Sequence, residues 1–177
     1  MMTLDGFFEG ASHNISWHNV DAEFNEFAIA QLHEIDTLLF GRLTYQLMAS
    51  YWPTPEAVKS DPIVASFMNR TPKVVFSKTL EKAEWDNTRL IKDHVADEIS
   101  NLKKQSGKDL AIFGSAKLMS VLMRMDLIDE HRVMLNPVIL GTGTPLFQTK
   151  EKFNLKLLKT RAFRNGNVLL WYELNRK

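Results

Sequence analysis

The stretch that decides the fold is Thr37-Leu38-Leu39-Phe40-Gly41-Arg42-Leu43-Thr44-Tyr45, where an apolar run meets a glycine and then a helical pattern. Residues 37–40 predict a buried strand, and apolar spacings near four predict a helix over residues 42–50. The unpaired N–H groups and the positive dipole end of such a helix attract phosphate, and arginine can bind phosphate through two parallel hydrogen bonds. The junction therefore predicts an anion site, with a tight turn and a solvated arginine as the alternative.

A second strand–glycine–helix junction follows at Ala111-Ile112-Phe113-Gly114-Ser115-Ala116-Lys117. Two junctions of this kind suggest a ligand with two phosphates, such as a dinucleotide. A plain helix cap is equally consistent with Gly114-Ser115, because serine is a favoured N-cap residue.

Composition excludes several classes of protein. The chain has 177 residues, with 22 Lys and Arg against 21 Asp and Glu, and this balance argues against nucleic-acid or membrane-surface binding. The absence of cysteine excludes disulfides and thiol catalysis. The five histidines lack metal-ligand spacing, so we expect no metal. The acidic start does not resemble a signal peptide, no apolar run reaches the length of a membrane span, and we expect a cytoplasmic protein.

The order of elements predicts an α/β fold. Strands at 37–40, 73–77, 88–92 and 110–113 alternate with helices at 21–35, 42–50, after Pro62, from Asp93 to Gly107, and at 115–125. A strand at 132–140 is interrupted by Pro137, and runs at 153–163 and 167–174 flank Arg164-Asn165-Gly166, a strong hairpin signal. Residues 52–55 are expected to form a rigid loop. We therefore expect one domain over residues 1–177, a three-layer α/β/α sandwich with a mixed, mostly parallel sheet and an antiparallel C-terminal hairpin.

The ordered series of motifs resembles the dihydrofolate reductase-like family, in particular the branch containing the C-terminal reductase domain of bacterial riboflavin biosynthesis. The resemblance rests on Thr3-Leu4-Asp5-Gly6-Phe7, Trp17, Gly41-Arg42-Leu43-Thr44-Tyr45, Val75-Phe76-Ser77-Lys78-Thr79-Leu80, Phe113-Gly114-Ser115-Ala116-Lys117-Leu118, Leu127-Ile128-Asp129-Glu130, Pro137-Val138-Ile139-Leu140-Gly141-Thr142-Gly143 and Pro145-Leu146-Phe147. These motifs span nearly the whole chain. Members usually carry several more apolar residues before the Leu-Asp-Gly element.

The resemblance implies NADPH as the cofactor. It places the pyrophosphate at the helix opened by Gly41, Arg42 and Thr44, and the adenosine 2′-phosphate near Ser77, Lys78 and Arg42. The second phosphate-binding turn would comprise Gly114, Ser115, Ala116 and Lys117. The nicotinamide would be bordered by Leu4, Asp5 and Gly6.

Candidates for the substrate side are fewer. Asp21 follows Trp17 by four residues, close to the spacing of the carboxylate that assists protonation in dihydrofolate reductase; a helix-start aspartate favoured by the dipole is the stronger alternative. Trp17 is either substrate-lining or core, and Asn136 is a candidate for a polar group in the substrate pocket. Tyr45, Tyr51 and Trp52 are more typical of packing than of ring stacking.

The resulting functional hypothesis is an NADPH-dependent reductase of a pteridine or ribosylaminopyrimidine, in which the cofactor performs hydride transfer. A non-catalytic nucleotide-binding or dimerisation module of the same fold is the rival, and a flavin-binding protein is disfavoured. The resemblance also implies a homodimer. The continuous apolar run at residues 168–172 supports it, because such a run requires cover on both faces.

Overall fold

The computed structural model describes residues 1–175, which form two compact units. Within the described residues, unit 1 comprises residues 1–26 and 119–175, and unit 2 comprises residues 27–118. The division falls within two helices, α1 (Ala22–Leu32) and α6 (Ala116–Arg124). The expected single domain over 1–177 stays a prediction, and its last two residues lie outside the described part of the chain.

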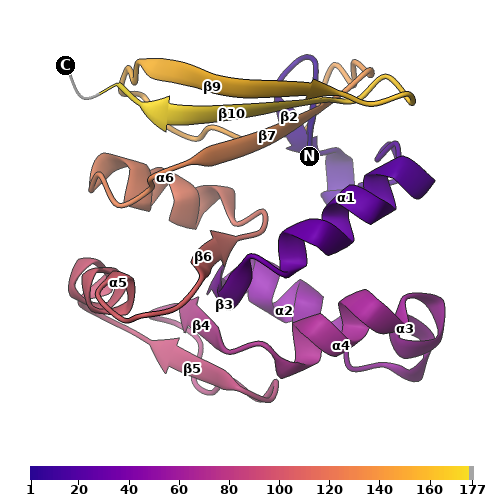
Figure 1. Ribbon diagram of the computed structural model, residues 1–177. Helices are drawn as coiled ribbons and strands as arrows, with labels where there is room; N and C mark the ends of the chain where they lie inside the picture. Colours follow the sequence, from indigo (N-terminus) through magenta and orange to yellow (C-terminus); the bar gives the residue numbers. More distant parts are fainter. Residues whose placement is uncertain (176–177) are drawn as a thin grey trace. The chain divides into compact units, whose positions relative to one another are not determined.

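Unit 2 is a parallel α/β unit (Figure 1). In chain order its complete elements are β3 (Ile35–Gly41), α2 (Arg42–Tyr51), α3 (Pro55–Ser60), α4 (Pro62–Arg70), β4 (Lys73–Phe76), β5 (Thr88–Ile91), α5 (Val95–Lys103) and β6 (Asp109–Ile112). The strands pair in parallel in the order β5-β4-β3-β6. Gly41 pairs with Phe76 and Leu39 with Ile112, so β3, β4 and β6 end at one edge of the sheet.

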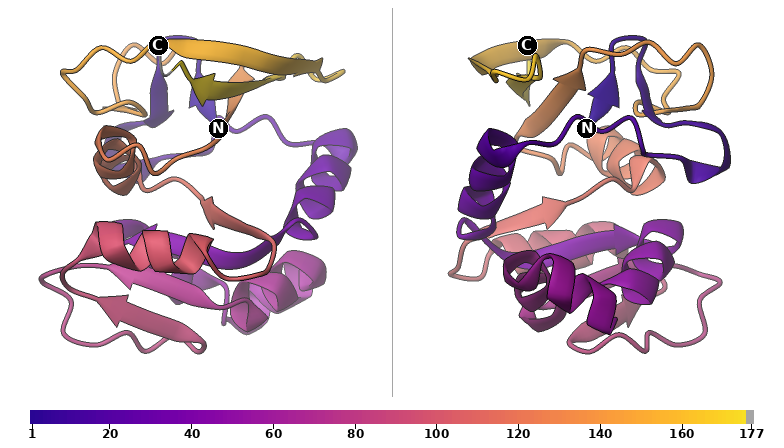
Figure 2. Two further views of the ribbon diagram at one scale, coloured as in Figure 1. Left: turned by 60° about the vertical axis from the view of Figure 1, so that its left-hand side comes forward. Right: turned by 90° about the vertical axis from the view of Figure 1, so that its right-hand side faces the viewer.

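Helices cover both faces of the unit 2 sheet. In Figures 1 and 2, α5 lies on one side of the strands and α2 with α4 on the other. The chain passes from β3 to β4 in one direction and from β5 to β6 in the opposite direction. Because parallel crossovers are right-handed, this reversal sends the two sets of helices to opposite faces.

The core of unit 2 is built around residues 37–45, the strand–glycine–helix junction. Leu38 and Phe40 are fully buried in β3, as the apolar run predicts. They belong to a cluster of buried residues, namely Ile35, Leu38, Phe40, Tyr45, Met68, Val75 and Trp85. Tyr45 is thereby confirmed as a packing residue, whereas Tyr51 on the same helix is 41% exposed.

Unit 1 joins both ends of the described chain. Its strands are β1 (Met2–Thr3), β2 (Phe7–Glu9), β7 (His131–Asn136), β8 (Thr144–Pro145), β9 (Leu155–Ala162) and β10 (Val168–Leu174), and a 3-10 turn, η1, covers Ala11–His13. The main sheet has the order β1-β7-β10-β9, in which β1 runs parallel to β7 and the β9–β10 hairpin is antiparallel. β2 and β8 form a separate pair.

The C-terminal hairpin is confirmed. Phe163 and Asn167 are joined by a 2.8 Å backbone hydrogen bond, and Gly166 has a φ of +88°. β10 lies between β7 and β9, and Leu169 and Trp171, which alternate along the strand, are buried. The mixed α/β class is likewise confirmed, although hydrogen bonding divides the strands into separate ladders instead of one continuous sheet.

Two expected elements are shorter in the structure. α1 ends at Leu32, so Ile35 is a buried residue of β3 and not part of the helix as predicted. β7 ends at Asn136, because Pro137 has no N–H to continue the ladder.

Two other boundaries were also wrong. The rigid loop expected over residues 52–55 ends at Thr54, and residues 55–60 form α3, because Pro55 suits a first helical position and the Thr54 hydroxyl accepts a hydrogen bond from the Ala57 amide. α5 begins at Val95 and ends at Lys103, so Gly107 does not close it. Gly107 instead abuts the Asp36 carboxylate, where a β-carbon would collide with Oδ2.

Candidate functional site

The candidate anion site lies where β3 and β6 end in unit 2. Gly41 precedes α2 in an extended conformation, and no side chain caps the first turn of this helix. The Gly41 amide donates a 3.0 Å hydrogen bond to Oγ of Ser115, the residue before α6. The structure therefore brings the N-termini of two helices together, as the two sequence junctions predict.

Gly114 and Ser115 form a left-handed turn between β6 and α6. Their φ angles are +67° and +52°, and Ser115 is buried. A β-carbon on Gly114 would lie 3.8 Å from Cγ2 and 4.0 Å from Oγ1 of Thr44 on α2. Thr44 thus faces this turn, and both junctions contribute to one site. Ser115 bonds to the other junction, which a plain N-cap does not require.

The charged candidates at this edge are exposed. Arg42 donates a 2.9 Å hydrogen bond to Gln46 one turn along α2, and Lys117 is exposed in the first turn of α6. Lys78 follows β4, and its Nζ lies 3.6 Å from the Asp93 carboxylate, with 82% of the side chain exposed. These three cations and the uncapped amides of α2 form a donor set that suits a polyanion.

Ser77 shapes the turn that carries Lys78. Its hydroxyl accepts hydrogen bonds from the amides of Thr79 at 3.2 Å and Leu80 at 3.0 Å. The Ser77 amide donates to the Ile91 carbonyl at 3.0 Å. Ser77 is therefore a turn-forming residue, and its expected contact with a phosphate stays a prediction.

The Leu4-Asp5-Gly6 turn belongs to unit 1 and has its own set of partners. The Asp5 carboxylate accepts hydrogen bonds from the Thr3 hydroxyl at 2.6 Å and from the Gly141 amide at 2.7 Å. The Thr3 bond is the main cause that holds the pKa of Asp5 below its ordinary value, and the amides of Gly141 and Leu140 add to it. Leu4 is exposed, and Gly6 has a φ of +90°. The structure thus ties this motif to the Gly141-Thr142-Gly143 loop within unit 1, and its nicotinamide role stays a prediction.

Asp21 caps α1. Its Oδ1 accepts a 2.8 Å hydrogen bond from the Phe24 amide, which is the helix-start role weighed against catalysis. The neighbouring Glu23 accepts hydrogen bonds from Arg161 and from the Arg164 amide, and the latter bond is the main cause that lowers its pKa.

Asn136 belongs to a buried asparagine cluster in unit 1. It is fully buried, and its Oδ1 accepts from the Asn19 amide at 2.8 Å. Asn167 is also fully buried and donates to the Asn19 carbonyl at 2.7 Å, and Asn165 donates to the same carbonyl. This cluster fixes residue 19 against the hairpin turn, and sequence reasoning detected only one of its members.

Trp17 is half-buried. Its indole N–H donates to the Asn14 carbonyl at 3.2 Å, and its ring packs edge-on against His18 at 4.5 Å. Trp17 therefore has local packing partners, and its substrate role stays a prediction.

A pH dependence of folding is expected from His18. Burial is the main cause that lowers its pKa from 6.5 to about 4, and the Met1 amino group contributes. Within residues 1–175 its buried Nε2 has no hydrogen-bond partner. As pH falls, His18 is protonated at a lower pH in the folded state than in the unfolded state. Stability should therefore decrease between pH 6.5 and 4, by about 2 kcal/mol after allowance for partial exposure.

Urea unfolding from pH 7 to pH 4 checks this expectation. His18→Leu should lose less stability over that range than the wild type, whereas His33→Gln, which alters an exposed histidine, should follow the wild type. Parallel curves for the wild type and His18→Leu would contradict the assignment.

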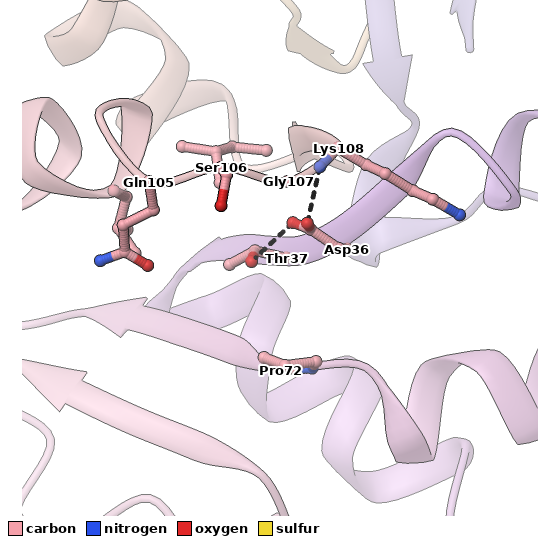
Figure 3. A pocket seen from close by; sticks show the side chains of 9 residues that line it. Asp36, Thr37, Pro72, Gln105, Ser106, Gly107 and Lys108 are labelled. Atoms are coloured by element: carbon pink, nitrogen blue, oxygen red, sulfur yellow. Dashed lines mark hydrogen bonds between the residues drawn. The ribbon is translucent and has the colours of Figure 1, made fainter.

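A pocket of about 210 Å³ lies at the other end of the unit 2 strands (Figure 3). Asp36 accepts hydrogen bonds there from the Thr37 hydroxyl at 3.1 Å and from the Lys108 amide at 2.7 Å. Along β3, Asp36 is about 16 Å from Gly41 at the usual rise of an extended strand. This pocket is thus separate from the candidate anion site.

No helix among the described residues has both the length and the apolar character needed to cross a membrane. Residues 1–175 contain no cluster of three or more His, Cys, Asp or Glu side chains arranged to hold a metal.

Comparison with known proteins identifies the family of this chain. The family model of the RibD C-terminal domain matches residues 1–169. The YyaP protein of Bacillus subtilis (strain 168) is 36% identical over 178 residues, covering 98% of this chain and 92% of YyaP.

Solved structures show the same fold. A protein of Shewanella sp. PV-4 named for riboflavin biosynthesis superposes with a TM-score of 0.76 at 24% identity, covering 99% of this chain and 96% of its own. The diaminohydroxyphosphoribosylaminopyrimidine deaminase/5-amino-6-(5-phosphoribosylamino)uracil reductase of Thermotoga maritima gives 0.68 at 16% identity, covering 98% of this chain and 54% of its own. The dihydrofolate reductase-like fold is thereby confirmed, and the chain belongs to the RibD C-terminal domain family.

Proposed function

We propose that this chain is an NADPH-dependent reductase of a small heterocyclic substrate, of the pteridine or ribosylaminopyrimidine type. The observation that carries the proposal is the junction of α2 and α6, where the Gly41 amide bonds to Ser115 and the first turn of α2 has no side-chain cap. Family membership and the reductase named among the structural neighbours support it.

The residues at this junction fit a dinucleotide phosphate. The uncapped amides of α2 would hold a pyrophosphate, with Arg42 and Thr44 beside them. The left-handed turn at Gly114 and Ser115 brings backbone close to the same point, and Ala116 and Lys117 continue it as the first turn of α6. Ser77 and Lys78 would meet the 2′-phosphate together with the Arg42 guanidinium.

The bound cofactor would supply the hydride, and the protein would supply position and electrostatics. Titration of the purified protein with NADPH, followed by nicotinamide fluorescence, tests the proposal directly. We expect saturable binding in the micromolar range. No binding at high micromolar NADPH would overturn the proposal.

Arg42→Ala is expected to weaken the binding of NADPH about ten- to hundredfold more than the binding of NADH. The reason is that a hydrogen bond to a charged group, here the 2′-phosphate, contributes roughly 1.5–3 kcal/mol. Fluorescence titration of both cofactors measures the difference. Arg70→Ala is the matched control, since it removes an exposed arginine from α4 of the same unit.

The outcome for Arg42→Ala also assigns the phosphate. Equal loss of NADPH and NADH affinity would move Arg42 to the pyrophosphate. Unchanged affinity for both would contradict a phosphate site at this turn.

A second candidate function is a nucleotide-binding module without catalysis. The observation that favours it is that two substrate-side candidates are already engaged: Asp21 caps α1, and Asn136 is fully buried against Asn19. NADPH binding without turnover of any pteridine, pyrimidine or carbonyl substrate would support this candidate.

The homodimer implied by the family resemblance stays a prediction.

A further inference from the structure

The segment that carries Ser77 and Lys78 has no regular secondary structure to hold it. It joins β4 to the neighbouring parallel strand β5 through residues 77–87, without a helix. Lys78 is largely exposed, and its nearest charged partner is Asp93 at 3.6 Å. The Ser77 amide bonds to the Ile91 carbonyl, and the Ser77 hydroxyl accepts from the amides of Thr79 and Leu80, so the start of the segment is fixed and its course beyond Leu80 depends on further anchors.

Trp85 anchors the far end of this segment. It is 6% exposed, and its indole N–H donates a 2.8 Å hydrogen bond to Oδ1 of Asn69 at the end of α4. The Lys73 ammonium lies 4.5 Å from the centre of the indole ring. Leu80 and Ala83 pack against the same core cluster and are partly buried, and Trp85 is the buried residue of the segment 77–87.

Tyr45 connects this anchor to the candidate anion site. Its hydroxyl accepts a 2.9 Å hydrogen bond from the Trp85 backbone amide, and its ring packs 6.2 Å from the indole. Tyr45 is buried and lies three residues after Arg42 on α2. One hydrogen bond therefore joins the helix that presents Arg42 to the segment that presents Lys78.

We propose that Tyr45 is a positioning residue for cofactor specificity: its bond to Trp85 ties the segment that carries Lys78 to α2, the helix that presents Arg42, so that both cations serve one 2′-phosphate. This inference rests on the proposed function. Tyr45 does not itself touch the cofactor; it acts through Trp85. Loss of the bond leaves α2 intact and removes one of the anchors of the segment, so the contact with the 2′-phosphate weakens while the pyrophosphate keeps its amides.

Tyr45→Phe tests the proposal, because it removes only the hydroxyl. We expect the preference for NADPH over NADH, measured as the ratio of their dissociation constants, to fall at least fivefold, while the NADH constant stays within twofold of wild type. Tyr51→Phe is the matched control on the same helix, since Tyr51 is exposed and packs against Trp52. It should change neither constant.

A second variant covers the case in which Tyr45→Phe does not fold. Trp85→Phe keeps an aromatic ring and the backbone amide but removes the bond to Asn69. It should lower the same ratio. The affinities for adenosine 2′,5′-bisphosphate and for AMP provide a readout without the nicotinamide. We expect both variants to lower the preference for the bisphosphate over AMP.

The outcomes distinguish failure of the positioning role of Tyr45 from failure of the proposed function. If the wild type prefers NADPH and both variants keep that preference, or lose both cofactors equally, the positioning role is overturned and the proposed function stands. If the wild type does not distinguish the two cofactors, the positioning role is also overturned. If it binds neither, the proposed function fails and takes this inference with it.

Discussion

Lys73→Met is expected to lower the free energy of unfolding by about 2–4 kcal/mol, because it leaves two buried carbonyls without donors. Lys73 is 1% exposed, and its ammonium donates to the carbonyls of Met68 at 2.8 Å and Thr71 at 2.7 Å. It therefore satisfies acceptors at the C-terminal end of α4, where a cation is also favoured by the helix dipole. Methionine matches the length of the side chain, so the change removes the donors with little loss of packing.

The pH dependence of folding isolates the cost of burying the Lys73 charge. Burial is the main cause that lowers its pKa from 10.5 to about 8, and the nearby Asp86 opposes the shift. Between these two values the folded state binds fewer protons than the unfolded state. Wild-type stability should therefore rise with pH through this window, by up to about 3 kcal/mol.

Urea unfolding between pH 7 and pH 10 measures both effects. At pH 7, Lys73→Met should be less stable than the wild type. Its free energy of unfolding should also lack the part of the rise with pH that comes from Lys73. Lys82→Met removes an exposed lysine of the same unit, whose contact with Glu84 at 3.7 Å is a surface ion pair worth about 0–1 kcal/mol. Equal stabilities for the two variants would contradict the role of Lys73.

Gly114→Val is expected to reduce NADPH affinity more than about a hundredfold, roughly 3 kcal/mol, while the protein remains folded. Gly114 has a φ of +67°, a conformation that penalises a β-branched residue. A β-carbon there would face Thr44, and the further methyl groups of valine would occupy the space where a phosphate must approach the backbone. Fluorescence titration measures the affinity, and circular dichroism checks the fold.

Gly114→Ala is the matched control for backbone strain. Its β-carbon would lie in ordinary contact with Thr44 at 3.8 Å, so alanine carries the left-handed penalty without the bulk. We expect alanine to lower stability by about 1–2 kcal/mol and to keep most of the affinity. An unchanged affinity in folded Gly114→Val would return this turn to a plain helix cap.

The candidate anion site could be predicted because its signals are local. Gly41 and Arg42 follow a strand and open a helix within a few residues, and the same holds for Gly114 and Ser115. The C-terminal hairpin was equally predictable, since Asn165-Gly166 permits the tight turn and two extended runs flank it. In each case neighbours in the sequence carry the whole signal.

Boundary errors arose where a local pattern competed with tertiary pairing. Ile35 fits the apolar face of a helix by spacing, but β3 pairs it with Asp109, and the strand prevails. Likewise the strand expected to continue past Pro137 stops at Asn136, where the side chain joins the asparagine cluster. Spacing alone cannot decide between two structures that both bury the same residue.

The sequence by itself determined the α/β class, the two glycine junctions and the hairpin, because each depends on residues only a few positions apart. Only the tertiary structure decided which distant residues meet: Gly41 with Ser115, Tyr45 with Trp85, and Lys73 with the end of α4. These contacts depend on strand order, since β6 reaches β3 only after the chain has passed through β4 and β5. Strand order is set by the burial of whole elements against one another, and no single stretch of sequence encodes it.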